Sequence, residues 1–254
     1  MTAPRLAKNY RLVEFDEIGS TNEEAKRFAA SGAEDGTLIW AHCQTAGRGR
    51  RGREWASARG NLFLSMVLRP ACAPLQAAQL NFVAALAVRD MLSIYIGNHE
   101  SIACKWPNDV LVEGRKISGI LLESSTAGSG IVEWLVLGVG INLRHHPDIG
   151  GRHPATSLYA EGAGEVDNSA ALEHFVEAFS RRRGEWLRGG FEATRESWLA
   201  HAFGIGRSAN IAFENDSESG IFTGIDDDGA LRLRGKDGMD RLFSAGDVTF
   251  EGSG

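Results

Sequence analysis

The sequence has few cysteines and lacks a continuous apolar run long enough to cross a membrane. Its three cysteines, Cys43, Cys72 and Cys104, are an odd number without C-x-x-C spacing, so neither a disulfide framework nor a zinc site is indicated. The longest apolar run, at 80–96, is interrupted by an Arg-Asp pair, and no apolar signal segment opens the chain. We therefore expect a cytoplasmic protein that does not enter a membrane.

Positive charge is also scarce. The 254 residues carry a net charge of -6 with a pI near 5.7, whereas a dedicated nucleic-acid-binding protein needs clustered Lys and Arg to neutralise phosphates. Only about ten residues precede the first predicted strand, too few for a DNA-binding helix-turn-helix, so we expect no DNA partner. With 43% hydrophobic residues, the chain can bury a substantial core.

The order of apolar patterns predicts an α+β fold with a β-rich C-terminal unit. Runs at 11–15, 37–43, 61–68, 110–112, 117–122 and 131–143 favour strands, and helical spacing predicts helices at 75–96, 169–187 and 191–203. Ser20 and Glu23 have the spacing of a capping box, so a helix should begin there and end near Gly32. Five short strand-like runs after 203 predict a small β-barrel, which divides the chain into domains at 1–203 and 204–254.

The segment 105–123 predicts a hairpin with polar groups on an otherwise buried pattern. If Glu113-Gly114 forms a two-residue loop, Asp109 and Lys116 project from the same face of the sheet on a cross-strand diagonal. An ordinary ion pair on a solvated face is the simplest interpretation of such a pair. A ligand site is favoured instead by two neighbouring residues. Pro107 interrupts the hydrogen bonding of a strand, and Gly119 leaves its backbone uncovered by a side chain.

Glycines alternate with arginines from Gly47 to Arg53. Such a segment cannot pack a core, but its backbone N–H groups and guanidinium groups can close around an anion. It is not a Walker loop, because no Gly-Lys-Ser/Thr follows. An Arg/Gly nucleic-acid tether is the alternative, but this segment lies between two strand-like runs rather than in a long tail. We favour a flexible phosphate-binding loop.

Two further motifs carry weaker signals. Gly138-x-Gly140 lacks the third glycine and the helix of a dinucleotide fingerprint. The two glycines indicate either a β-bulge or a strand whose backbone packs closely on a flat ligand. His145, His146 and His153 have no carboxylate or cysteine at ligand spacing. We therefore expect no metal-ligating set of side chains.

Five ordered motifs resemble those of biotin-protein ligases. They are Ser20-Thr21-Asn22, the loop 47–52, Lys-Trp-Pro-Asn-Asp at 105–109, Arg115-Lys116-x-x-Gly119-Ile120-Leu121 and Gly138-x-Gly140-Ile141-Asn142. Five motifs in order are more specific than any one of them, and the resemblance is to the monofunctional type without an N-terminal DNA-binding domain. It implies a mixed sheet with helices packed on it, the class II synthetase-like catalytic fold of biotin and lipoate ligases, followed by an SH3-like barrel.

This resemblance implies a two-step activity. Biotin and ATP, accompanied by Mg2+, would form biotinyl-5'-AMP and pyrophosphate, and the biotinyl group would pass to a lysine of a biotin carboxyl carrier protein or domain. The attacking group is the carboxylate of biotin, so the enzyme must hold two anions together and stabilise charge at the α-phosphate. Lys116, Arg50 and Asp109 are implied as catalytic. Asp109 would orient Lys116, bind through Mg2+ or assist loss of the acceptor lysine's proton, and these alternatives stay open.

The resemblance also implies the binding residues. Those for biotin are Ser20, Thr21, Asn22, Gln44, Gly47, Arg48, Arg50, Lys116, Gly119 and Gly138. Those for the nucleotide are Arg50, Arg53, Trp55, Asn108, Asp109, Lys116 and Asn142. Members of the family commonly end near an arginine that reaches the nucleotide, and the segment 248–251 offers none, so no contact between barrel and ATP is expected.

Two alternative functions remain from the sequence. A lipoate-protein ligase shares the architecture and the adenylate chemistry, but the loop 47–52 resembles the biotin enzymes. A non-catalytic nucleic-acid-binding module that uses the arginines is disfavoured by the net charge of -6. A homodimer is compatible with the sequence.

Overall fold

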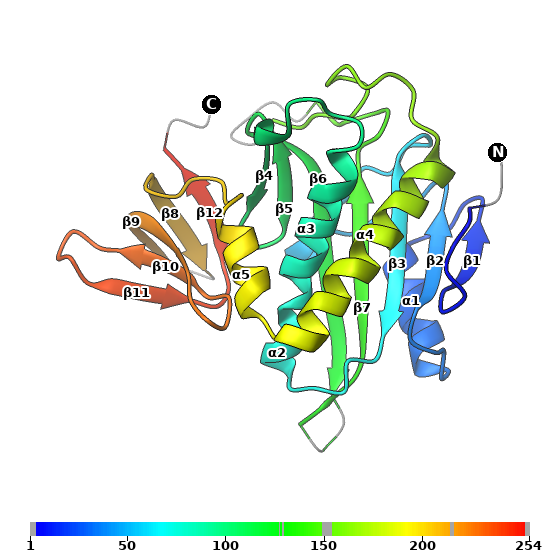
Figure 1. The fold of residues 1–254 in the computed structure, drawn as a ribbon, viewed down its shortest axis with the longest axis horizontal. Coiled ribbons are helices and arrows are strands. Elements are labelled where there is room, and N and C mark those ends of the chain that lie inside the picture. The colour runs from blue at the N-terminus through cyan, green and yellow to red at the C-terminus, as the bar shows by residue number, and fades with distance from the viewer. Residues whose placement is uncertain (1–3, 127, 129, 149–153, 214–215, 252–254) are drawn as a thin grey trace.

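The larger part of the protein is a seven-stranded mixed sheet with the order β1-β2-β3-β7-β6-β5-β4 (Figure 1). The computed structural model describes residues 4–126, 128, 130–148, 154–213 and 216–251. β1 pairs with β2 in parallel, and the other neighbouring pairs are antiparallel, which confirms the predicted mixed sheet. The strands are β1 (Arg11–Phe15), β2 (Thr37–Ala41), β3 (Leu62–Leu68), β4 (Ile102–Lys105), β5 (Asp109–Val112), β6 (Arg115–Thr126) and β7 (Val132–Ile141).

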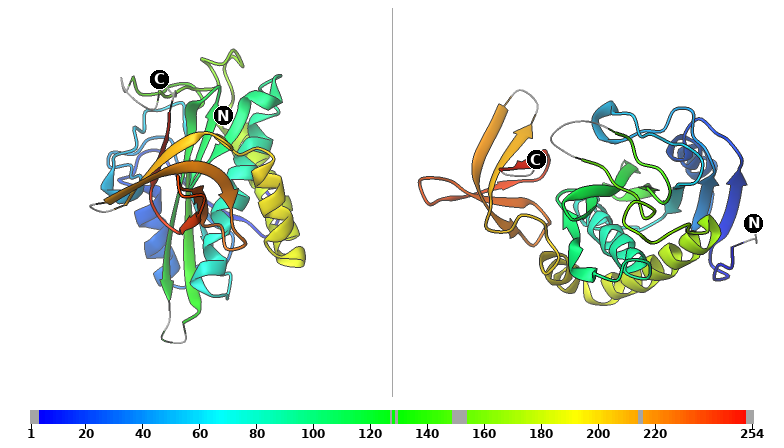
Figure 2. Two further views of the ribbon diagram at one scale, coloured as in Figure 1. Left: turned by 90° about the vertical axis from the view of Figure 1, so that its left-hand side faces the viewer. Right: turned by 90° about the horizontal axis from the view of Figure 1, so that it is seen from above.

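Helices cover both faces of this sheet (Figures 1 and 2). On one face lies α1 (Thr21–Ala30), whose Ala25 and Ala29 pack with Ile39 of β2. On the opposite face lie α2 (Pro74–Ala78), α3 (Leu80–Leu92), α4 (Asn168–Gly189) and α5 (Glu192–Leu199). Neighbouring β2 residues Leu38 and Trp40 belong to this second core, as the two-residue period of a strand requires. No helix in the described ranges combines the length and apolar content needed to cross a membrane.

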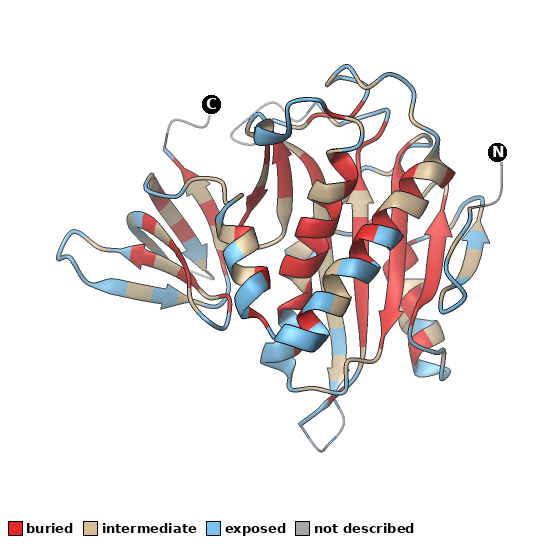
Figure 3. Cartoon of the chain, in the orientation of Figure 1, coloured by how far each residue is buried: buried red, intermediate tan, exposed pale blue. Residues whose placement is uncertain are grey.

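The predicted apolar stripe of α3 is confirmed. Figure 3 shows this helix buried along most of its length. The six apolar residues that recur at helical spacing in this segment are all fully buried: Leu80, Val83, Ala84, Ala87, Val88 and Met91. The single helix predicted at 75–96 is nevertheless wrong, since α2 and α3 are separated at Gln79. There the backbone forms tight i→i−3 hydrogen bonds, and the Gln79 side chain accepts a hydrogen bond from Trp186 Nε1 at 3.0 Å.

The start of α1 also differs from the prediction. Ser20 occupies the N-cap position, but its side chain makes no capping hydrogen bond. Glu23 accepts from Lys26 Nζ at 2.7 Å and from Arg48, so its carboxylate is not available to close a capping box. The expected end of the helix is confirmed, because Gly32 follows Ser31 with a φ of 87°.

The C-terminal residues form a separate five-stranded antiparallel sheet with the order β11-β10-β9-β8-β12. Its strands are β8 (Ser208–Phe213), β9 (Asp216–Ile225), β10 (Leu231–Arg234), β11 (Asp240–Phe243) and β12 (Asp247–Phe250), which match the five predicted runs. The β9–β10 turn packs on the larger part, because Trp106 Nε1 donates to Gly229 O at 3.0 Å. Gly229 has a φ of 89°, and a Cβ there would collide with the Phe82 ring.

Candidate active site

A cavity of about 520 Å³ lies where α1, the arginine loop (residues 47–53), the β5–β6 hairpin, β7 and β12 meet. The predicted site residues found in its lining are Ser20, Thr21, Asn22, Gln44, Arg48, Arg50, Arg53, Trp55, Asn108, Asp109, Lys116, Gly119, Gly138 and Asn142. Gly47 is not in the lining; it lies behind it, where a Cβ would overlap Ser57 Oγ and the Trp55 carbonyl. What these residues do toward a ligand stays a prediction.

The β5–β6 hairpin brings a carboxylate and an ammonium group together, as predicted. Val112 pairs with Arg115 and Leu111 with Lys116 across the two-residue loop. A register shift at Val110 and Leu111 then places Asp109 opposite Gly119. Lys116 Nζ lies 2.6 Å from Asp109 Oδ1, and both side chains face the cavity rather than open solvent.

Trp55 forms one wall of the cavity by lying on bare backbone. Gly119 and Gly140 are paired across β6 and β7, and a Cβ on either would collide with the Trp55 ring. Lys116 Nζ lies 5.4 Å from the centroid of the same ring, within range of a cation–π interaction. Two of the predicted glycine motifs therefore serve one purpose, which is to seat this ring beside Lys116.

The arginine loop is tied to three different elements. Arg50 Nη1 donates to Asn108 Oδ1 at 3.0 Å, and Asn108 Nδ2 donates to Ile120 O at 2.6 Å, which links the loop to the hairpin. Arg48 pairs with Glu23 of α1, and Arg53 pairs with Asp247 of β12. Burial lowers the pKa of Arg50, but a guanidinium starts so high that it stays charged at neutral pH.

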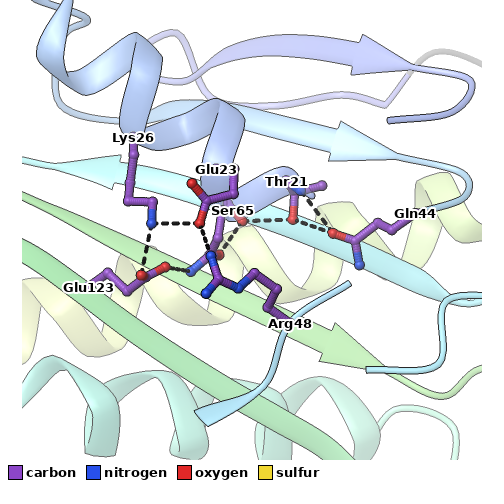
Figure 4. A network of polar contacts seen from close by, with 8 residues as sticks. Thr21, Glu23, Lys26, Gln44, Arg48, Ser65 and Glu123 are labelled. Carbon is purple, nitrogen blue, oxygen red and sulfur yellow. Dashed lines mark hydrogen bonds and ion pairs between the residues drawn. The ribbon is translucent and has the colours of Figure 1, made fainter. Parts of the chain in front are cut away.

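Figure 4 shows a polar network beside α1, of which Thr21, Gln44 and Arg48 belong to the cavity lining. Gln44 Oε1 accepts hydrogen bonds from Thr21 N at 2.8 Å and from Thr21 Oγ1 at 3.1 Å. Buried Ser65 donates to Asn22 Oδ1 at 2.6 Å, and Asn22 Nδ2 donates to Glu123 Oε2 at 2.9 Å. These bonds fix the orientation of both side-chain amides. A Cβ at Gly138 would overlap the Asn22 amide, so that glycine makes room for the network.

Two more predicted or neighbouring side chains are buried at the site. Asn142 is 2% exposed and its Nδ2 donates to Thr156 O at 3.0 Å. Lys105 is 7% exposed, and burial lowers the pKa of its ammonium group. Lys105 belongs to the 105–109 motif, yet the sequence did not single it out as a site residue.

Other residues of the site were also missed. Ser65, which is not in the lining but donates to Asn22, had a signal, because a serine inside the apolar run 61–68 needs a polar partner. Asp247 and Val248 had none, since they lie in the C-terminal sheet. They bring β12 of the C-terminal sheet to the cavity with a carboxylate rather than an arginine, and whether this sheet contacts ATP stays a prediction.

The cavity is predominantly cationic. Its charged lining residues are Arg48, Arg50, Arg53, Lys105 and Lys116 against Glu54, Asp109 and Asp247. Leu64, Val139 and Trp106 add apolar surface. Among the described residues, no cluster of three or more His, Cys, Asp or Glu side chains is arranged to hold a metal ion, and His153 lies outside those residues. The arrangement suits anionic ligands that also carry a flat or apolar part.

Comparison with known proteins agrees with this geometry. Residues 14–142 match the Biotin/lipoate A/B protein ligase family, and residues 204–250 match the Biotin protein ligase C terminal domain. A solved biotin protein ligase from Aquifex aeolicus in complex with biotin and ATP has a TM-score of 0.81 and 26% identity, covering 96% of this chain and 99% of that one. The fold is that of a biotin or lipoate ligase.

Relatives narrow this class further. A biotin--[acetyl-CoA-carboxylase] ligase from Paracoccus denitrificans is 44% identical over 92% of this chain and 98% of that protein. Another from Mycobacterium tuberculosis is 35% identical over 91% of this chain and 86% of that protein. The chain belongs to the biotin/lipoate A/B protein ligase family, and within it the resemblance is to the biotin-protein ligases.

Proposed function

We propose that this protein is an ATP-dependent ligase that activates biotin as biotinyl-5'-AMP and transfers the biotinyl group to a lysine of a biotin carboxyl carrier protein or domain. The observation that carries this proposal is the division of one cavity into two ends. Thr21 and Gln44 present hydrogen-bonding groups at one end, and Lys116, Arg50 and Arg53 present cations at the other. The family membership supports it.

Biotin fits the hydrogen-bonding end through its urea. Ser20, Thr21, Asn22 and Gln44 supply hydroxyl and amide groups there, and Gly138 keeps the strand open beside them. The dithiolane of lipoate has no matching donors or acceptors. If lipoate occupied the cavity, two or three protein hydroxyl or amide groups would lack a hydrogen-bond partner, and each would weaken binding by about 1 to 3 kcal/mol. We therefore expect the protein to prefer biotin to lipoate at least a hundredfold. Gln44→Leu is expected to weaken biotin binding far more than ATP binding.

Adenylation requires two anions to approach each other. A carboxylate oxygen of biotin attacks the α-phosphorus of ATP, the bond from that phosphorus to the bridging oxygen breaks, and pyrophosphate leaves with the electron pair. Lys116 and Arg50 are the cations placed to offset the charge that gathers at the α-phosphate. Asp109, 2.6 Å from Lys116 Nζ, orients the ammonium group toward the cavity.

Transfer uses the same end of the cavity. The amine of the carrier lysine attacks the biotinyl carbonyl carbon and loses one proton, and AMP leaves. Trp55, Asn108 and Asn142 line the side on which the nucleotide would lie. Arg53 and Arg48 belong to the loop that would cover the adenylate and shield the mixed anhydride from water between the two steps.

Mg2+ fits this cavity as a companion of the ATP phosphates. Magnesium is usually held by one or two carboxylates together with substrate phosphates and water, rather than by an all-protein cage. The carboxylates in the lining are Glu54, Asp109 and Asp247, and two of these are paired with cations. When bound, the ion would neutralise charge on the leaving pyrophosphate.

The domains, the cellular setting and the oligomeric state of the protein are also part of the proposal. We propose a catalytic unit at 1–203, a C-terminal unit at 204–254 and a cytoplasmic setting, where ATP and an acceptor carboxylase are both present. DNA is not proposed as a partner, and a homodimer stays a prediction that sedimentation of the purified protein would test.

One experiment separates the two acids. The protein is incubated with ATP, Mg2+ and labelled biotin or labelled lipoate, and the adenylate is separated by chromatography. Biotinyl-5'-AMP should accumulate at least a hundredfold faster than lipoyl-5'-AMP, and addition of a carrier domain should move the label onto that protein. Equal rates with the two acids would replace the biotin assignment with the lipoate one.

A further inference from the structure

The first residues of β6 have no residue of β7 beside them. β7 ends opposite Ser118, so the backbone groups of Lys116 on that side need other partners. The segment 154–158 supplies them. Lys116 N donates to Pro154 O at 2.8 Å, and Thr156 N donates to Lys116 O at 2.9 Å, which together form an isolated parallel bridge. The backbone that carries the Lys116 ammonium group is therefore held on this side by a loop.

Thr156 holds two residues of the cavity at once. It is 1% exposed, and besides its bond to Lys116 its carbonyl accepts from Asn142 Nδ2 at 3.0 Å. Both of these held residues line the cavity, and Thr156 itself does not. The hydroxyl of Thr156 donates to Oε1 of Glu161. Thr156 thus connects Glu161 to two predicted nucleotide-binding residues.

The Glu161 carboxylate joins this loop to β6 from the side away from the cavity. Its side chain is 9% exposed, and Arg115 Nη2 lies 2.9 Å from Oε1 and donates to Oε2 at 3.0 Å. Arg115 precedes Lys116 in β6, and successive side chains of a strand point to opposite faces. Glu161 N donates to Ser157 O at 3.0 Å, which closes the turn that returns the carboxylate to Thr156. Hydrogen bonds to an ionised group are stronger than neutral ones, so these two ties are well suited to fix the loop.

We propose that Glu161 is a positioning residue for adenylation: through Thr156 and Arg115 it fixes the backbone of Lys116 and the amide of Asn142, without touching a ligand. A displacement of about 1 Å at a site that stabilises developing charge can lower a rate about 10²-fold. This inference rests on the proposed function for the reaction whose rate is measured. Its geometric part, that Glu161 fixes Lys116, depends on no assumption about the ligand.

The first readout is the kcat of biotin-dependent ATP–pyrophosphate exchange. Glu161→Ala should lower kcat about tenfold to a hundredfold, because Lys116 is no longer held in place. The KM for biotin should change by less than about twofold, since the urea would bind at the other end of the cavity. Glu161→Gln keeps an oxygen that can accept from Thr156, so its kcat should return to within about threefold of wild type.

Asp90→Ala is the matched control. Asp90 is a second carboxylate with little exposure, at 15%; it pairs with Arg181 and Arg182 of α4 and is not part of the cavity lining. The control should unfold at a lower urea concentration than wild type and keep the wild-type kcat. A loss of kcat confined to Glu161→Ala therefore separates positioning from a general loss of stability.

The second readout is amide hydrogen exchange, measured by NMR on the protein alone. The N–H groups of Lys116 and Thr156 form the bridge, and the amides of β3 serve as the reference within each variant. Without the carboxylate the loop should open more often, so both N–H groups should exchange about tenfold or more faster in Glu161→Ala, relative to β3. Asp90→Ala should leave this ratio unchanged.

Thr156→Val provides an independent route to the same contact, and it replaces Glu161→Ala in both assays if that variant does not fold. It removes the hydroxyl that donates to Glu161, so it should lower kcat and speed the exchange of the Lys116 N–H in the same direction. The double variant should be no slower than the slower single one, because both substitutions break one interaction.

Contrary results overturn the inference in distinct ways. An unchanged exchange ratio in Glu161→Ala would show that Glu161 does not fix Lys116. A wild-type kcat in that variant, an equal loss in Asp90→Ala, or no recovery in Glu161→Gln would show that Glu161 does not set the adenylation rate through Thr156. If the wild-type protein forms no adenylate from biotin, the proposed function fails, and the exchange ratio still decides whether Glu161 fixes Lys116.

Discussion

Replacing Lys116 with alanine removes the cation that the hairpin places in the cavity. A single positioned donor at a site of developing negative charge is worth about 2.7 to 4 kcal/mol of transition-state stabilisation, which corresponds to about 10² to 10³ in rate. The substitution also leaves Asp109, which is 19% exposed and loses its partner at 2.6 Å, as an uncompensated charge near the phosphates. We therefore expect Lys116→Ala to lie toward the upper end of this range.

A second variant separates the repulsion by the Asp109 carboxylate from the loss of the Lys116 cation. In Lys116→Ala combined with Asp109→Asn, the cation is still missing but the added repulsion is gone, so the loss should fall toward the lower end of about 10². Rates come from biotin-dependent ATP–pyrophosphate exchange. The free energy of unfolding should change by less than about 1 kcal/mol in the double variant, because the pair is partly exposed and the ladder of the hairpin is untouched. Exchange within threefold of wild type in Lys116→Ala, or a double variant slower than the single one, would refute this reasoning.

Three further outcomes are expected. Thr21→Val should weaken biotin binding about tenfold without changing ATP binding, measured by calorimetry, because a hydroxyl of the urea end is lost; equal losses for both ligands would contradict this. Gly138→Ala should also weaken biotin binding, since its Cβ would displace the Asn22 amide, whereas Gly97→Ala, with nothing within 4 Å, should bind biotin as the wild type does. Burial raises the pKa of Asp90, but hydrogen bonds from Arg182 and Arg181 of α4 lower it by more than burial raises it. The pKa of Asp90 therefore lies below its ordinary value of 3.8. The ionised Asp90 therefore stabilises the fold fully above about pH 4, and this contribution is lost as the pH falls through the lowered pKa. Asp90→Asn should lower the free energy of unfolding by about 1 to 3 kcal/mol at pH 7, and the decrease of that free energy toward acid pH, measured by urea unfolding, should become smaller. An unchanged decrease would exclude Asp90 as its source.

The parts of the site that the sequence predicted well are local. The β5–β6 hairpin depends on a two-residue loop and on alternation over a few residues on either side, and its Lys116–Asp109 contact follows from that register. Even the register shift at Val110 leaves the pair together. The C-terminal strands were equally accessible, because short β runs separated by Gly and Asp allow few other interpretations.

The parts that were wrong or missed depend on partners far away in the sequence. The capping box at Ser20 failed because Glu23 is drawn to Lys26 and Arg48. The break at Gln79 is accompanied by a hydrogen bond from Trp186, which helical periodicity does not contain. Asp247 reaches the loop from another sheet, so no local pattern marks it. Hydrogen bonds and ion pairs between residues so far apart in the sequence can be recognised only from the folded structure.

The seat of Trp55 on two paired glycines makes the effects of mutations at these positions dependent on order. Alanine at Gly140 is obstructed while the indole lies on the strand, because the added methyl group and the ring would occupy the same space. Once Trp55 has been exchanged for a small residue, that obstruction is gone and alanine at Gly140 becomes structurally neutral. Evolution or directed selection that places a side chain at Gly140 would therefore have to change the tryptophan first. The glycines are fixed by the ring above them, and the same backbone becomes free to vary when the ring is lost.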